Sequence, residues 1–102
     1  MAEVIVSKNA DADLERLVAF LAREERDVAL ATYDLVLGAL EVLQTYPSIG
    51  RPVDEVLREL VISRGGTGYL ALYEYDMRTD RVVILALRHQ REAGYLERGE
   101  TE

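Results

Sequence analysis

The side chains with the greatest chemical potential lie close together near the end of the chain, in the run Arg88-His89-Gln90-Arg91 and at Tyr95. Histidine is the residue type that transfers protons most readily near neutral pH. Arginine can stabilise the charge that develops on a phosphate, and tyrosine can position or protonate a leaving group. Together these groups are suited to cutting RNA through its own 2'-hydroxyl without a metal. The structural alternative, which these residues alone favour, is that His89 caps a sheet edge, Tyr95 packs the tail on the core and the arginines are solvated.

A second feature is an uneven distribution of charge. Residues 1–55 contain 5 basic and 11 acidic side chains, whereas residues 58–91 contain 6 basic and 4 acidic ones, on a chain of net charge -7. A mildly basic second half can face an anionic target, through Arg58, Arg64, Arg88 and Arg91. The alternative is that these arginines pair with Glu59, Glu74 and Glu92, and both interpretations are open.

Several kinds of site are excluded by composition. The chain has no cysteine and a single histidine, which excludes disulfides, thiol nucleophiles and multi-histidine metal sites. Gly65, Gly66 and Gly68 precede a predicted strand rather than a helix, so they do not form a phosphate-binding loop. We therefore expect no cofactor and no metal. With neither a signal-peptide pattern nor an apolar run of about 18 residues, we expect a cytoplasmic protein without a membrane segment.

The elements that must position these groups follow from hydrophobic periodicity. Alternation predicts a strand over Glu3–Ser7. Apolar residues at helical spacing predict a helix from Asp13, with Asn9 or Asp11 as its N-cap. A second helix is predicted over Val28–Gln44.

The rest of the chain is predicted to form three strands, over Leu57–Ser63, Tyr69–Asp76 and Arg81–Leu87. The polar turn at 77–80 makes the last two an antiparallel hairpin, and the apolar run of the last strand indicates a central strand covered on both faces. Helices grouped before strands predict a single α+β domain over 1–102, in the order β-α-α-β-β-β. Its helical hairpin packs on a small sheet, and a short polar tail begins at about residue 96.

The second predicted helix carries two apolar stripes. One contains Val28, Leu35, Ala39 and Val42, and the other contains Leu30, Tyr33, Leu37, Leu40 and Leu43. A helix with so much apolar surface is usually buried on two sides. Either the first helix and the sheet cover it, or a partner chain covers part of it.

Four segments in this order resemble the RelE/ParE superfamily of type II toxin–antitoxin toxins, and the resemblance spans nearly the whole chain. They are LQTYPSIGRPV (Leu43–Val53), LRELVIS (Leu57–Ser63), the tyrosine-rich YLALYEYD (from Tyr69) and VVILALRHQREAGY (Val82–Tyr95). The resemblance implies a RelE/ParE-like fold with a mainly antiparallel sheet. It also implies a toxin from a plasmid-stabilisation module, held inactive in a complex with a cognate antitoxin.

The superfamily includes two activities, and the residues favour one of them. RelE-like members are ribosome-dependent mRNA endoribonucleases, whereas ParE-like members inhibit DNA gyrase. RelE-like nucleases carry an arginine just after the glycine-tyrosine of the middle strand, where this chain has Leu70, and lysines that are missing here. A net charge of -7 also disfavours docking inside a ribosome. We therefore expect a gyrase inhibitor. The nuclease alternative stays open because Arg91 and Tyr95 resemble the nuclease's terminal arginine and tyrosine, although at a different spacing.

The resemblance also implies roles for individual residues. In a gyrase inhibitor, the expected target-binding residues are Arg58, Arg64, Arg88 and Arg91. In a nuclease, Arg64 and Arg91 would stabilise phosphate charge, while His89 or Tyr95 would transfer protons. The residues expected to contact the antitoxin are Leu30, Tyr33, Leu37, Tyr73 and Tyr75.

Overall fold

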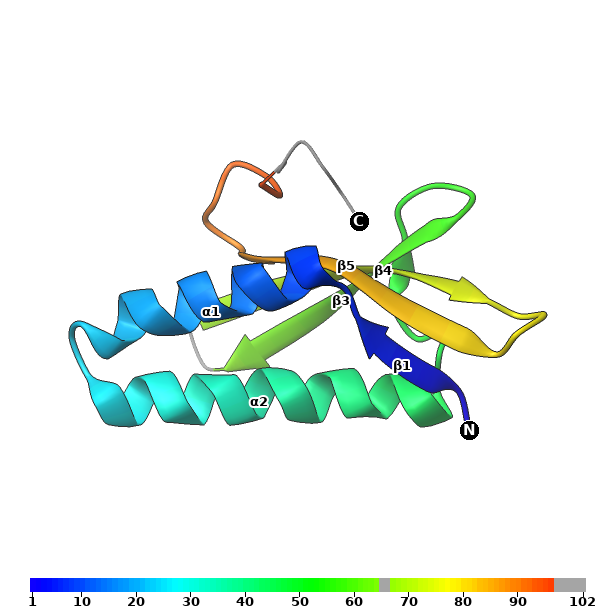
Figure 1. The fold of residues 1–102 in the computed structure, drawn as a ribbon. Helices are drawn as coiled ribbons and strands as arrows, with labels where there is room; N and C mark the ends of the chain where they lie inside the picture. Colours follow the sequence, from blue (N-terminus) through cyan, green and yellow to red (C-terminus); the bar gives the residue numbers. More distant parts are fainter. Residues whose placement is uncertain (65–66, 97–102) are drawn as a thin grey trace.

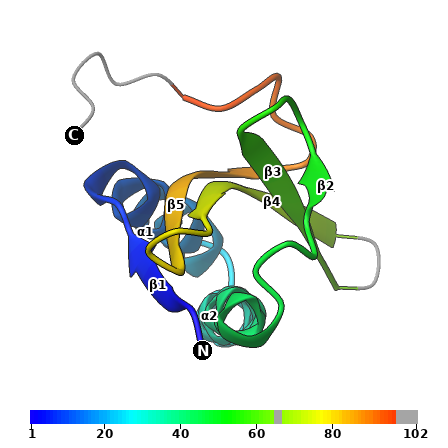
Figure 2. The same ribbon diagram turned by 90° about the vertical axis from the view of Figure 1, so that its right-hand side faces the viewer.

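The computed structural model describes residues 1–64 and 67–96, with the backbone but not the side chains at 63, 64 and 67. Two helices pack side by side on one face of a five-stranded sheet of order β1-β5-β4-β3-β2 (Figures 1 and 2). β1 pairs with β5 in parallel, and the other pairs are antiparallel. The predicted α+β class is confirmed. The elements are β1 (Glu3–Val6), α1 (Lys8–Ala22), α2 (Arg26–Thr45), β2 (Arg51–Pro52), β3 (Leu57–Arg64), β4 (Thr67–Asp76) and β5 (Arg81–His89).

The start of α1 differs from the prediction. The helix begins at Lys8, and its N-cap is Ser7, whose Oγ accepts the Ala10 N–H at 3.0 Å. The expected N-caps, Asn9 and Asp11, instead lie inside the helix. A polar first turn carries no hydrophobic periodicity, so the pattern located the helix only from its first apolar stripe. β2 was also not predicted, because two residues are too few to show alternation.

Strand β5 is central, as predicted, and it carries a bulge. Leu72 pairs with Ala86 whereas Tyr73 pairs with Ile84, so Leu85 is an extra residue on β5. The parallel pairing with β1 stops at Val6 opposite Ile84. Beyond this point, the backbone groups on the outer edge of β5 need other partners.

Helix α1 supplies those partners. The Leu85 carbonyl accepts from Asn9 Nδ2 at 2.8 Å and from the Ser7 hydroxyl at 3.3 Å. The Leu87 N–H donates to Oδ2 of the fully buried Asp13 at 2.9 Å. Polar side chains at the start of α1 therefore replace the missing strand and fix the helix against the sheet.

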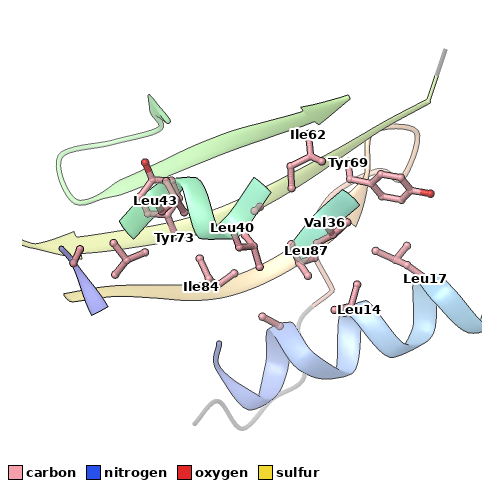
Figure 3. Close-up of a cluster of buried hydrophobic side chains, with 14 residues drawn as sticks. Leu14, Leu17, Val36, Leu40, Leu43, Ile62, Tyr69, Tyr73, Ile84 and Leu87 are labelled. Carbon is pink, nitrogen blue, oxygen red and sulfur yellow. The ribbon is translucent and has the colours of Figure 1, made fainter. Parts of the chain in front are cut away.

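The core lies between the helices and the sheet (Figure 3). Its largest buried side chains include Val36 and Leu43 of α2 and Ile84 and Leu87 of β5. On α1, the stripe that was predicted from spacing, including Leu14 and Leu17, faces the same cluster.

Tyr73 on β4 anchors the loop between α2 and β2. Its side chain is 0% exposed, and its hydroxyl accepts the Gly50 N–H at 2.8 Å. A Cβ at Gly50 would lie 2.7 Å from the Tyr73 ring and 2.9 Å from the Glu59 carbonyl oxygen, so the approach requires glycine. The expectation that Tyr73 contacts an antitoxin is therefore corrected, because this residue belongs to the core.

Only one face of α2 is packed against the protein. Val36, Leu40 and Leu43 are buried, whereas Leu30 is 54% and Tyr33 41% exposed. In the described part of the chain, α2 is the one helix that is long and apolar enough to cross a membrane. Length and composition do not separate a membrane span from a helix that packs on a core, as α2 does here.

We predict that Tyr73→Phe destabilises the protein by about 1–3 kcal/mol, because the buried Gly50 N–H loses its acceptor. Urea denaturation followed by circular dichroism measures this change. The matched control is Tyr33→Phe, which removes a hydroxyl from an exposed ring and should leave stability nearly unchanged. Equal stability of the two variants would contradict the anchoring role.

Candidate functional site

The two faces of the sheet are covered differently. The helices cover one face, and the segment that follows β5 crosses the other (Figures 1 and 2). We call the second surface the helix-free face. Because side chains alternate along a strand, Leu87 and His89 point towards the helices while Arg88 points to the helix-free face. Glu59 of β3 points the same way as Arg88, since its neighbour Arg58 pairs with the core residue Tyr73.

Glu59 is the centre of the helix-free face. It is only 8% exposed, and its Oε1 accepts from Arg51 Nη2 at 2.6 Å and Nε at 3.0 Å. Its Oε2 accepts the Tyr95 hydroxyl at 2.5 Å. One carboxylate therefore joins the edge strand β2 to the C-terminal segment. A buried charge needs such partners, because an unpaired one would be costly.

Arg88 and Glu92 hold the rest of the C-terminal segment. The Arg88 guanidinium lies 5.1 Å from the Tyr95 ring centre, a cation–π distance, and its Nη1 donates to the Glu92 carbonyl at 2.7 Å. The Glu92 carboxylate accepts from Arg16 of α1 at 2.6 Å and from the His89 N–H at 2.9 Å. The segment is thus attached to α1 at one end and to β3 at the other.

These contacts change the acidity of three groups. Burial raises the pKa of the Tyr95 phenol, and the hydrogen bond to Glu59 and its charge raise it further. Burial would also raise the pKa of Glu59, but hydrogen bonds from Tyr95 and Arg51, with the charges of Arg51 and Arg88, lower it overall. At Glu92, the opposing effect of burial is outweighed mainly by Arg16, so its pKa is lowered too. Both carboxylates are therefore ionised at neutral pH, and the phenol stays protonated.

The structure separates the groups of the predicted nuclease set. Tyr95 and Arg88 meet on the helix-free face, but His89 packs edge-on against Tyr69, with ring centres 5.1 Å apart. Tyr69 is buried on the side of the helices. Arg91 is exposed, and its backbone N–H donates to His89 Nδ1 at 3.0 Å. Arg88, rather than Arg91, is thus the arginine beside Tyr95.

Two other predicted target-binding residues have different surroundings. Arg58 reaches the loop after α2, where its Nη1 donates to the carbonyls of Ser48 at 3.0 Å and Gly50 at 2.7 Å. This contact gives Arg58 a role in fixing the loop. Arg64 ends β3, and its side chain lies outside the described residues.

Sequence reasoning anticipated the pairing of Glu59 and Glu92 with arginine but not the partners. The partners are Arg51 and Arg16. Arg51 lies at the border of the basic second half of the chain, and Arg16 lies far from it. The signal that could have identified Glu59 is a carboxylate inside the strand Leu57–Arg64. Arg16 and Asp13, 3.5 Å apart at a spacing of three residues, had no comparable signal.

The residues expected to contact an antitoxin do not form one surface. Leu30 and Tyr33 are exposed on α2, whereas Leu37 is half-buried and packs against the core. Tyr75 is half-buried on β4, and its hydroxyl donates to Asp80 at 2.7 Å. Among the described residues, no group of three His, Asp or Glu side chains is arranged to hold a metal ion.

Two helices on a mixed sheet, with an arginine and a tyrosine on the opposite face, are consistent with a RelE/ParE-like toxin fold. Residues 4–94 match the family described as the ParE toxin of the type II toxin–antitoxin system parDE. The chain therefore belongs to the ParE toxin family, within the RelE/ParE superfamily that its motifs resemble. Membership of a toxin–antitoxin family implies a cognate antitoxin as partner.

Two curated toxins from Caulobacter vibrioides are similar to this chain. Toxin RelE3 is 33% identical over 92 residues, which make up 90% of this chain and 98% of that toxin. Toxin RelE1 is 34% identical over 70 residues, or 69% of this chain and 75% of that toxin. The family name and the names of these relatives thus point to the two branches of one superfamily.

We predict that the Glu59 network stabilises the protein at neutral pH and fails in acid. A carboxylate with a lowered folded pKa contributes stability above its unfolded pKa of about 4.3, which is lost as the pH falls through the folded value. Glu59→Gln should therefore cost about 1–3 kcal/mol near pH 7 and much less near pH 3. Urea denaturation at both pH values measures the difference.

The control is Glu55→Gln, which makes the same charge change at an exposed position between β2 and β3. We expect it to be nearly neutral at both pH values. A cost of Glu59→Gln that stays constant between neutral and acidic pH would show that charge does not hold the network.

Proposed function

We propose that this toxin acts in the cytoplasm by binding a protein target, DNA gyrase, and that it does not cut RNA. The observation that carries the proposal is the state of the helix-free face. Its central cations, Arg51 and Arg88, act on an internal carboxylate, Glu59, rather than on an open anion site. A surface whose central cations already act on an internal carboxylate favours recognition of a protein over recognition of a polyanion.

The proton-transfer groups support the same proposal. His89 points away from the helix-free face and packs on Tyr69. The Tyr95 phenol already donates to Glu59, and its pKa is raised by burial and by this carboxylate, so it is a poor base. Leu70, at the position where the nucleases carry an arginine, is buried. Cleavage through the 2'-hydroxyl would therefore lack a base.

The second candidate is a ribosome-dependent mRNA endoribonuclease. It is favoured by the contact between Arg88 and Tyr95 and by the names of the relatives RelE3 and RelE1. In this candidate, Arg88 would stabilise the phosphate and Tyr95 would act as the acid. The ribosome would have to displace Glu59 from the Tyr95 hydroxyl.

We also propose a site for the antitoxin on α2, centred on Leu30 and Tyr33. Both side chains are large, apolar and exposed, one turn apart on the same side of the helix. An amphipathic helix of the antitoxin can bury them in the way that such helices bind apolar grooves. The toxin and antitoxin would then form a heteromeric complex within a plasmid-stabilisation module.

We predict that the purified toxin inhibits DNA supercoiling by gyrase and that expression without antitoxin arrests growth with DNA damage. The control is the same assay with antitoxin added first, which should restore supercoiling. Growth arrest with fully active gyrase would contradict the proposal. Primer extension on mRNA from the arrested cells would then test the nuclease, since cleavage in register with codons would identify it.

We predict that Leu30→Asp weakens antitoxin binding at least about tenfold, because a central apolar contact contributes roughly 1–2 kcal/mol or more to binding. Isothermal titration calorimetry with the cognate antitoxin measures the effect. Met77→Asp is the control, since Met77 is equally apolar and more exposed but lies at the tip of the β4–β5 turn. Equal losses in the two variants would remove α2 as the site.

A further inference from the structure

The helix-free face contains an arrangement that resembles an occupied anion site. Glu59 accepts three hydrogen bonds, two from the Arg51 guanidinium and one from the Tyr95 hydroxyl. The positive charge of Arg88 acts on the same carboxylate. Guanidinium and hydroxyl donors around a nearly buried oxyanion are also the groups that recognise phosphate.

The charges around Glu59 do not cancel. Two guanidinium groups act on one carboxylate, while Glu92, the carboxylate that holds the C-terminal segment to α1, is already paired with Arg16. The Arg88 Nε–H is buried and has no hydrogen-bond partner among the described residues. A buried donor without an acceptor is unusual, so the cluster retains both positive charge and an unused donor.

We propose that Glu59 is a built-in anion that occupies a phosphate-binding site formed by Arg51, Arg88 and Tyr95, and thereby excludes phosphate ligands from the helix-free face. The ligand class is a phosphate oxyanion, either free or in a nucleic-acid backbone. Glu59 is thus a specificity-determining residue. It keeps a fold that carries an arginine and a tyrosine in contact from binding RNA.

Glu59 has an advantage over an external phosphate in binding Arg51 and Tyr95, because its carboxylate is covalently part of the protein. Glu59 is held on β3 by pairing with both β2 and β4, so it loses little freedom when it meets Arg51 and Tyr95. A free phosphate would lose its translational freedom and would also meet the negative charge of Glu59. Replacing the carboxylate with a neutral group removes both the competitor and the repulsion.

The test compares Glu59→Gln and Glu59→Ala with the wild-type protein. The probes are inorganic phosphate and a short fluorescein-labelled single-stranded RNA, at neutral pH and low salt. We expect both variants to bind the RNA at least about tenfold more tightly than the wild type, with an affinity that falls steeply as salt is added. If only inorganic phosphate binds, the site accepts the free ion and not a nucleic-acid backbone, and the built-in-anion role still stands.

Two controls separate a local site from a general change in charge. Glu55→Gln changes the net charge equally at an exposed position and should bind like the wild type. Adding Arg51→Gln to Glu59→Gln should abolish the gain in RNA affinity, because it removes one of the two guanidinium groups of the site. Folded Glu59 variants that bind no better than Glu55→Gln would overturn the proposal.

A measurement on the wild-type protein covers the case in which the Glu59 variants do not fold. Nuclear magnetic resonance of the arginine side chains should show the Arg51 and Arg88 signals unmoved by added phosphate at neutral pH. Movement of both signals would mean that the face binds an anion with its carboxylate in place, which would overturn the proposal. Neither experiment contains gyrase or antitoxin, so its failure is distinct from failure of the proposed function.

Discussion

The structure depends on how the outer edge of β5 is completed. This strand is apolar and lies inside the sheet, but its parallel neighbour β1 ends at Val6, so the outer edge of β5 has no strand partner from Leu85 onwards. Buried peptide groups without partners would cost more than most side-chain contacts provide. Ser7, Asn9 and Asp13 supply the missing partners from the first turns of α1. This requirement sets where the helix starts, how it lies on the sheet and, through Arg16, where the C-terminal segment is attached.

The number and placement of the helices also explain how the helix-free face is built. Both helices lie on one side of the sheet, so the residues on the other side are covered by the segment that follows β5 (Figures 1 and 2). This segment is held by charge and hydrogen bonds through Glu92 and Tyr95. A surface assembled in this way is sensitive to single charges, which is why Glu59 has so much influence on what the face can bind.

Much of the fold could be predicted from the sequence, because its elements have strong periodicity. The α1 stripe at Leu14 and Leu17 and the apolar run of β5 led directly to the correct class and to the elements along the chain, except for β2. The parallel pairing of β1 could not be predicted, since alternation does not report which strand is the neighbour. The contacts of the candidate site were harder to predict from the sequence than the fold. Arg88 and His89 are adjacent in sequence and lie on opposite faces, whereas Arg51, Glu59 and Tyr95 meet only because β2, β3 and the C-terminal segment converge. Such contacts leave no local pattern.

The contact between Ser7 and Leu85 joins residues separated by 78 positions in the chain. During synthesis, β1 and the polar start of α1 therefore emerge long before the strand that they pair with. Native folding cannot be completed until β5 has left the ribosome, because loop closure over this distance precedes any gain from the parallel pairing. Both faces of the sheet, including the one that holds Arg88, are therefore completed only after β5 has been synthesised. In this toxin the helix-free face therefore cannot form until β5 is available, later than the two helices that precede it in the chain.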